Sequence, residues 1–284
     1  MQSLSGGTTK HGVKECSVKS MKVEVLVAAV EQEPEQLVKD MKLDSDAIII
    51  NQCDQISYEE REENGHRLRF YGMAERGVGL SRNSALMRAE GEICLFSDQD
   101  IVYEDGYEEK IVEEFEKNPK ADMLLFNIEV EAERRTYHNE GTKRVHWYNS
   151  GRYGAVSFAV RREALLSSGV TFSLLFGGGA RYSNGEDSLF LLDFLKKGYR
   201  VYTSPVRIGW ERPSESTWFS GYHEKFFFDR GVLYHALYGR FAGLMALRYL
   251  YAHKDILCTQ LTLSQALLQM KSGIREGIQK GRRR

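Results

Sequence analysis

Two carboxylates separated by a single residue follow a short apolar stretch at Leu95–Asp100, which reads LFSDQD. Hard divalent cations prefer oxygen ligands, and Mg²⁺ commonly takes one or two carboxylates together with the phosphates of its substrate. We therefore interpret Asp100 as the ligand of a cation that bridges two phosphates, and Asp98 as a neighbour that reaches the cation, the ribose or the sugar. An isolated pair with this spacing is more often a turn capped by aspartate, so the hypothesis depends on further residues.

A basic side chain lies just upstream, in residues 77–86, which read GVGLSRNSAL. The glycines predict a turn that opens a helix, and both a helix start and an arginine fork attract anions. Arg82 and Asn83 are therefore candidates for contacts to a diphosphate or a base. The same residues are equally explained by an ordinary helix whose arginine faces solvent.

Two further carboxylates, Glu186 and Asp187, immediately precede an apolar run that predicts a helix over 189–197. A carboxylate held opposite a departing diphosphate can take the proton of an acceptor hydroxyl as it attacks a sugar carbon, so this pair is the candidate catalytic base. A carboxylate at a helix start is also explained as a cap. The glycines at 177–179 form either a mobile segment over the acceptor site or a structural turn.

Strands and helices alternate around these motifs. Apolar runs predict strands over 22–30, 47–51, 92–97, 123–130, 155–161 and 200–208, and helices over 34–41, 79–89, 106–118, 162–168 and 189–197. This alternation predicts an α/β fold with a mainly parallel sheet and helices on both faces. Ligands of such sheets bind at the carboxyl ends of the strands, where three polar loops would share one crevice.

Composition divides the chain into three parts. Residues 1–20 lack the apolar core of a signal peptide and are interpreted as a native flexible arm, an overlong start or a cloning remnant. Residues 21–213 form the predicted catalytic domain, and residues 214–284 a helical subdomain. An aromatic cluster at the start of this subdomain is interpreted as core between the two parts, or else as a floor for a sugar or lipid carrier. Its members are Trp218, Phe219, Tyr222, Phe226, Phe227 and Phe228.

The overall composition excludes several classes of protein. The 284 residues carry a net charge of -1, which argues against a nucleic-acid binder, since such a protein needs a broad basic surface. Hydrophobic residues make up 42% and there are only 4 prolines, so the chain is ordered and globular. The 4 cysteines form no C-x-x-C pair, and we expect them to be reduced in a cytoplasmic protein.

The ordered set of motifs resembles the family 2 glycosyltransferases of bacterial polysaccharide synthesis. The match runs through GLSRN at 79–83, FSDQD at 96–100 and GED at 185–187, and spans most of residues 22–210. The resemblance implies a GT-A fold, a nucleoside-diphosphate sugar as donor, with UDP preferred, and Mn²⁺ or Mg²⁺ held by Asp98 and Asp100. It also implies inversion at the anomeric carbon, with Asp187 as base.

The resemblance also implies which residues contact the nucleotide base, but this sequence lacks one metal ligand that is common in the family. It implies that Ala29, Glu31 and Asp54 lie near the base, with Asp54 paired to the uracil N–H. Many GT-A enzymes supply a histidine as a further metal ligand, whereas residues 208–213 here read IGWERP. Glu211 or the later His223 is the candidate replacement.

The resulting prediction is an inverting, metal-assisted glycosyltransferase that acts on a saccharide or lipid-linked saccharide. The basic C-terminus and the lipid-linked acceptor suggest the hypothesis that the protein binds peripherally to the inner face of the cell membrane. The aromatic C-terminal region offers a surface for an oligomer. A non-catalytic sugar-binding or nucleotide-binding module of the same fold is the alternative. A nucleotidyltransferase is disfavoured, because residues 28–34 are acidic and contain no glycine.

Overall fold

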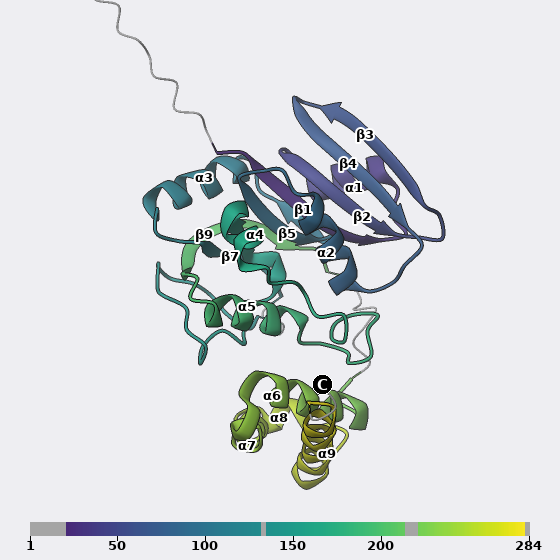
Figure 1. Cartoon of the computed structure of the whole chain (residues 1–284), viewed down its shortest axis with the longest axis vertical. Coiled ribbons are helices and arrows are strands. Elements are labelled where there is room, and N and C mark those ends of the chain that lie inside the picture. The colour runs from purple at the N-terminus through teal and green to yellow at the C-terminus, as the bar shows by residue number, and fades with distance from the viewer. Residues whose placement is uncertain (1–20, 132–134, 214–220, 282–284) are drawn as a thin grey trace, which may run out of the picture.

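The computed structural model describes residues 21–131, 135–213 and 221–281. Among these residues a single sheet of nine strands runs in the order β3-β4-β2-β1-β5-β8-β7-β9-β6 (Figure 1). The strands are β1 (Val23–Val30), β2 (Asp46–Gln52), β3 (Ser57–Glu63), β4 (His66–Met73), β5 (Ile93–Asp98), β6 (Ile101–Tyr103), β7 (Met123–Glu129), β8 (Phe158–Arg161) and β9 (Val201–Glu211). The predicted arm at residues 1–20 lies outside the described residues.

The neighbouring strands β4, β2, β1 and β5 are parallel. β1 pairs in parallel with both β2 and β5, β2 with β4, and β7 with β9, whereas β3, β6 and β8 run antiparallel to their neighbours. Ala28 lies opposite Ile50 on one side and opposite Asp98 on the other. The register therefore places the acidic motif beside the loops that follow β1 and β2.

Helices cover both faces of the sheet, as the alternation of elements predicts (Figure 1). One face packs against α1 (Pro34–Met41) and α3 (Tyr107–Lys117), and the other against α2 (Val78–Arg88), α4 (Arg162–Ser168) and α5 (Glu186–Lys196). β1 is buried on both faces, with Val25 in the first cluster and Leu26 in the second, which is why its sequence is apolar throughout. The predicted α/β fold is confirmed.

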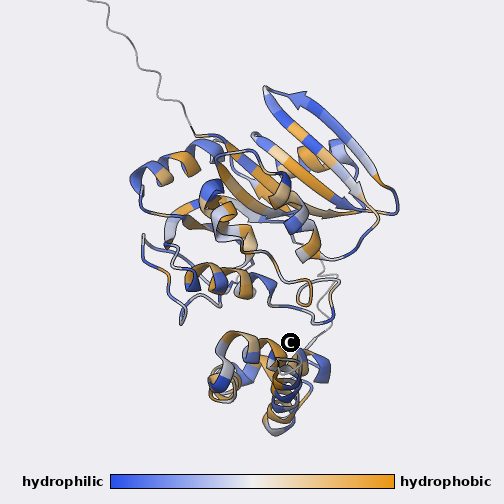
Figure 2. Cartoon of the chain, in the orientation of Figure 1, coloured by the Kyte–Doolittle hydropathy of each residue, from blue (hydrophilic) through white to orange (hydrophobic). Residues whose placement is uncertain are grey.

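The hairpin of β3 and β4 is an element that the sequence analysis missed. β3 reads SYEEREE and has no apolar face, so its pattern does not announce a strand. The turn does carry a signal, because Asn64 and Gly65 both have positive φ, as the tight turns of hairpins require. The charged strand, blue in Figure 2, forms one edge of the sheet and protects that edge against pairing with other chains.

The C-terminal helices form a separate apolar cluster. They are α6 (Glu224–Tyr238), α7 (Ala242–Ala252), α8 (Lys254–Leu257) and α9 (Leu263–Gly281). Tyr222, Phe226 and Phe227 pack inside this cluster, whereas Phe228 packs with Phe176 of the catalytic part. Phe226 and Phe227 are thus buried core, Tyr222 and Phe228 are partly buried against these clusters, and the predicted Trp218 and Phe219 lie outside the described residues.

The two parts meet where α6 contacts α5 (Figure 1). Val232 and Leu233 of α6 share an apolar cluster with Phe176 and Tyr182. The predicted boundary at residue 213 borders the segment 214–220, which is outside the described residues, so that boundary stays a prediction. Within the described chain, no helix combines the length and the apolar character that crossing a bilayer requires.

Candidate active site

A single buried arginine lies at the centre of the candidate site. Arg82 Nη2 donates to both carboxylate oxygens of Asp98, at 2.9 and 3.1 Å. Its Nη1 donates to Asp187 at 2.7 Å and to Glu186 at 3.1 Å. Only 3% of the Arg82 side chain is exposed. The structure thus joins three motifs that are separate in the sequence.

Each member of this cluster is positioned by a different element. Arg82 projects from the buried side of α2 and stacks over the ring of Phe172, with 5.3 Å to the centroid. Asp98 is the last residue of β5, and the two other carboxylates open α5. Gly185 directly precedes α5 and has a φ of 114°. A Cβ at this glycine would lie 2.4 Å from the Leu233 side chain, so the contact with α6 helps to set the start of α5.

The cluster contains one guanidinium and three carboxylates. Burial and the charge of Asp187 raise the pKa of Glu186 to about 7, against the opposing effect of Arg82. Burial also raises the pKa of Asp187, again opposed by Arg82. Burial disfavours the charge of Arg82, but the carboxylates of Asp98, Asp187 and Glu186 hold its pKa above the ordinary value. With all three carboxylates ionised the cluster carries a net negative charge, and burial opposes that charge by raising the pKa values of Glu186 and Asp187.

Glu186→Gln should make the protein less sensitive to pH. Because the folded-state pKa of Glu186 is about 7 against an ordinary 4.5, Glu186 favours the folded state most below pH 4.5, and this contribution is lost as the pH rises through 7. We expect the stability of the variant relative to the parent to increase between pH 5 and pH 8, by on the order of 3 kcal/mol. Chemical unfolding at both pH values measures it.

Glu163→Gln is the matched control for that measurement, because Glu163 is exposed in the first turn of α4. Its stability should follow that of the parent at both pH values. A Glu186→Gln curve parallel to the parent curve would show that the charge of Glu186 does not oppose folding at neutral pH.

Asp187 is oriented from two sides. Its Oδ1 accepts from Arg82, and its Oδ2 accepts from the backbone N–H of Ala155 at 3.1 Å. The side chain still exposes 23% of its surface. This carboxylate is thus held in one orientation and remains accessible to solvent. Glu186 is less accessible, because only 11% of its side chain is exposed.

The loop of the acidic motif is tied to its neighbours by Gln99 and Arg212. The Gln99 side chain accepts from the Val30 N–H at 2.7 Å, and Arg212 donates to the backbone oxygens of Gln99 and Asp100. Glu211 comes close to the loop through strand pairing, since it lies opposite Ile101. His223 precedes α6, on the far side of a segment outside the described residues.

The residues present fit a hard divalent cation. Carboxylate oxygens are its preferred ligands, and the excess negative charge beside Asp98 would be offset by two positive charges. In the described part of the chain, no group of three or more His, Cys, Asp or Glu residues is arranged to hold a metal by itself. That pattern suits Mg²⁺ or Mn²⁺ bound through one or two carboxylates and the phosphates of a substrate.

Arg76 organises the loops that follow β1 and β2, and the sequence analysis missed it. Its Nη2 donates to Glu31 at 2.8 Å and to Asp54 at 3.1 Å, and its Nη1 donates to the Gln52 backbone oxygen at 2.7 Å. The two carboxylates are mostly exposed. The structure therefore brings Glu31 and Asp54 together at one position beside the sheet.

The side chains of Ala29 and Asn83 are both engaged in packing or hydrogen bonds within the fold. The Ala29 side chain is fully buried within β1, which leaves only its backbone for a ligand. The Asn83 amide exchanges two hydrogen bonds with the Phe172 backbone, at 2.8 and 2.9 Å. Their predicted contacts with a nucleotide sugar remain predictions.

The glycines at 177–179 pack against the cluster. The Gly178 oxygen accepts from the Val78 N–H at 3.0 Å, which covers the start of α2. Gly177 has a φ of 106°, and a Cβ there would lie 2.8 Å from the carboxyl carbon of Glu186. The segment is thus a turn that only glycine fits at this position, and it buries Glu186.

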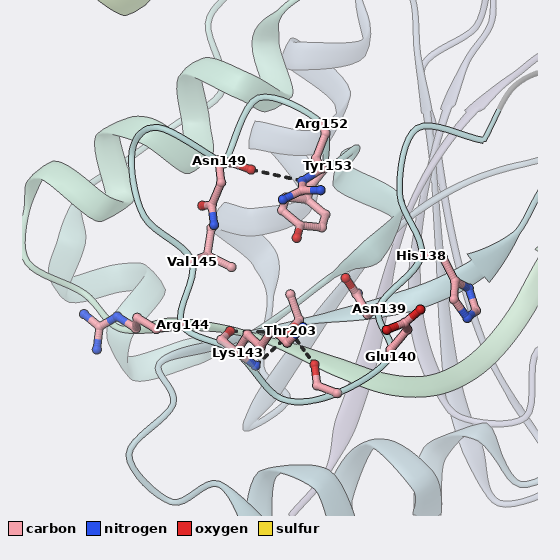
Figure 3. A pocket seen from close by; sticks show the side chains of 11 residues that line it. His138, Asn139, Glu140, Lys143, Arg144, Val145, Asn149, Arg152, Tyr153 and Thr203 are labelled. Atoms are coloured by element: carbon pink, nitrogen blue, oxygen red, sulfur yellow. Dashed lines mark hydrogen bonds between the residues drawn. The ribbon is translucent and has the colours of Figure 1, made fainter.

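A polar cavity of about 130 Å³ is lined by residues between His138 and Tyr153 and by Thr203 (Figure 3). Figure 3 shows Arg152 and Tyr153 on one side of it and Asn139 and Thr203 on the other. Tyr153 is two residues before Ala155, a span of at most about 7 Å along the chain. The chain that lines the cavity at Arg152 and Tyr153 thus continues directly to Ala155, which binds Asp187.

A tight turn next to this cavity displays two aromatic rings. The His146 N–H donates to the Asn149 side chain at 2.8 Å, and the Asn149 N–H donates to the His146 oxygen at 3.1 Å. Trp147 is 60% exposed and Tyr148 62%. The turn thus presents two large aromatic rings to solvent, and its residue Asn149 lines the cavity.

Comparison with known proteins gives a family and a fold. The sequence model described as "Glycosyl transferase family 2" matches residues 24–165. No curated protein matches the chain. Three solved structures of S. aureus TarS are similar in fold at 16 to 17% identity.

The similarity to TarS covers most of this chain. The structure of TarS residues 1–349 with UDP-GlcNAc has a TM-score of 0.62, at 17% identity over 91% of this chain and 81% of the other. The complex of the same fragment with UDP has a TM-score of 0.55, at 17% identity over 84% and 74%. A longer TarS chain has a TM-score of 0.55 at 16% identity, and the match covers 84% of this chain and 44% of the TarS chain. The architecture is thus that of the GT-A glycosyltransferases.

Proposed function

Because the chain belongs to glycosyl transferase family 2, we propose that it moves a sugar from a nucleoside-diphosphate donor to an acceptor hydroxyl, with inversion at the anomeric carbon. The observation that carries the proposal is the convergence of Asp98, Glu186 and Asp187 on Arg82. This cluster lies at the carboxyl end of β5, where open α/β sheets bind their ligands.

Asp187 is the base of the proposed reaction. The acceptor oxygen attacks the anomeric carbon from the face opposite the diphosphate and forms the new C–O bond. The bond from the sugar to the diphosphate breaks, the diphosphate keeps the electron pair, and the hydroxyl proton passes to the Asp187 carboxylate. The hydrogen bonds from Arg82 and Ala155 hold that carboxylate in place, and its raised pKa makes it a better proton acceptor than an ordinary aspartate.

The donor is a UDP-sugar in this proposal. The fold similarity to TarS structures that contain UDP-GlcNAc and UDP supports a nucleotide at the same edge of the sheet. Glu31, Asp54 and Arg76 would then surround the base, with Asp54 as acceptor for the uracil N–H. Arg82 acts as a positioning residue, since its guanidinium is occupied by carboxylates.

Asp98 and Asp100 would hold Mn²⁺ or Mg²⁺ together with the donor, with Glu211 or His223 as a further ligand. The cation supplies neutralisation of the charge that develops on the departing diphosphate.

A thermal-shift panel tests the donor proposal. UDP, UDP-sugars and other nucleoside diphosphates are added with and without Mn²⁺, since a ligand that binds only the folded state raises the unfolding temperature. We expect a shift selective for uridine nucleotides that Asp54→Ala reduces and that the exposed control Asp105→Ala leaves unchanged. No shift with any nucleotide would contradict the proposal, and binding without transfer would favour the non-catalytic alternative.

The acceptor is a saccharide that stacks on the aromatic turn at 146–149. Trp147 and Tyr148 offer exposed rings between Val145 and Asn149, which line the cavity, and aromatic faces stack on sugar rings.

Trp147→Ala should weaken binding of the acceptor and leave binding of the donor unchanged. With a soluble oligosaccharide acceptor we expect its KM to rise about tenfold, which corresponds to the loss of one stacking contact, and the donor KM to stay unchanged. Tyr58→Ala is the control, because Tyr58 is 55% exposed at the distant edge strand β3. An unchanged acceptor KM in Trp147→Ala would place the acceptor elsewhere.

A further inference from the structure

The helix α7 carries large apolar side chains on its exposed side. Leu244 is 66% exposed, Leu247 47% and Tyr251 71%, and Phe241, just before the helix, is 55% exposed. Their spacing of three and four residues places them on one stripe of the helix surface. We call these four residues the exposed apolar face of α7.

The same helix already has a buried apolar face. Ala242, Ala246 and Leu250 are spaced four residues apart and pack into the cluster formed with α6 and α9. An amphipathic helix needs only one such face, and its opposite side is normally polar. Among the residues that the structure describes, no other element therefore covers the exposed apolar face, and a patch of this kind marks an interaction surface.

The charged side chains from Arg240 to Lys254 are all positive, and Asp255 follows them. From Arg230 to Lys254 the sequence contains no Asp or Glu. Arg240 lies over the ring of Phe241, with 4.9 Å to the centroid, and Lys254 lies over the ring of Tyr251, with 5.9 Å. Cations thus lie beside the exposed aromatics at both ends of the helix, and the exposed Arg248 lies between them.

We propose that α7 docks in the plane of an anionic lipid surface. An interfacial helix of this type inserts an apolar face at the boundary of headgroups and acyl chains, while Lys and Arg meet the lipid phosphates. A second copy of this chain fits less well, because a symmetric contact would bring the like charges of Arg240, Arg248 and Lys254 together. The proposal does not depend on the proposed reaction.

Vesicle flotation with the full chain tests the docking. One set of vesicles is phosphatidylcholine alone, and the other is phosphatidylcholine with phosphatidylglycerol at 3:1. We expect binding to the anionic set, which weakens as salt is added. The triple variant Leu244→Gln/Leu247→Gln/Tyr251→Gln should reduce this binding at least tenfold. The single variants Arg240→Gln, Arg248→Gln and Lys254→Gln should each reduce it about fivefold.

The control is Ile56→Gln/Met87→Gln, which removes two apolar side chains that are 88% and 71% exposed on the catalytic part, and its binding should equal that of the parent. Equal binding of the parent and the Leu244 triple variant would overturn the proposal, since the lipid contact would then lie elsewhere. Absence of binding by the parent would also overturn it. A concentration-dependent dimer in sedimentation equilibrium, abolished by the same triple variant and without vesicle binding, would assign the face to a second copy instead.

Discussion

Asp187→Asn should abolish most of the sugar transfer and leave donor binding intact. The amide has the same shape but only one oxygen, so it keeps the hydrogen bond from Arg82 or the one from Ala155 and loses the other, and it cannot accept the proton of the acceptor hydroxyl. We expect kcat to fall by about 10³-fold, within the range for loss of a general base. Initial rates with the donor identified by thermal shift, together with the dissociation constant of that donor, give the two numbers.

Asp193→Asn is the matched control, because Asp193 lies on the same helix with 53% of its side chain exposed and forms only a surface ion pair with Lys196. Its kcat should equal that of the parent. Full activity of Asp187→Asn would remove this carboxylate from the reaction. An equal loss of donor affinity would mean that the substitution damages the site as a whole.

Arg82→Met should strongly destabilise the protein. Methionine fills similar space, yet it leaves Asp98, Glu186 and Asp187 without the cation they share. Removing one partner of a buried ion pair costs about 3 to 5 kcal/mol, because the remaining charges are uncompensated. We expect the unfolding temperature to fall by about 10 °C at pH 8. The fall should be smaller at pH 5, where Glu186 is protonated.

Arg88→Met is the control for this substitution. Arg88 belongs to the same helix α2 but contacts the Ser84 backbone oxygen and the Tyr71 ring, with no carboxylate among these partners. Its unfolding temperature should fall far less. If Arg82→Met does not fold, Arg82→Lys keeps the charge without the fork and should show an intermediate loss. Partial recovery in Arg82→Met/Glu186→Gln would identify charge repulsion as the cause, and an unfolding temperature of Arg82→Met equal to that of the parent would contradict the role of the cluster.

The helices and strands around the three motifs were predictable because their signals are local. β1, β5 and β7 are buried on both faces, so continuous apolar runs identify them. The order of the strands in a mainly parallel sheet then places Asp98 and the loops after β1 and β2 at one edge. The charged strand β3 was not predicted, because an exposed edge strand needs no apolar face and therefore shows no apolar run.

The partners of the motifs were beyond local patterns. Arg82 was predicted to contact a diphosphate, and in the structure it binds Asp187, which is 105 residues away in the sequence. Arg76 joins Glu31 and Asp54 in the same way, from a position that no motif marked. Such contacts depend on how helices pack across the sheet, which side-chain type and spacing do not encode.

The sequence by itself determined which residues carry charge and which strands end in them, because the periodicity of burial and the chemistry of each side chain are properties of a few neighbouring positions. Only the tertiary structure decided that three carboxylates share one arginine, that Asp187 rather than Glu186 is the more reachable of the pair, and that α7 shows apolar residues on both sides. The physical reason is that burial and charge pairing are set by segments distant in the chain, whose contact is a result of folding.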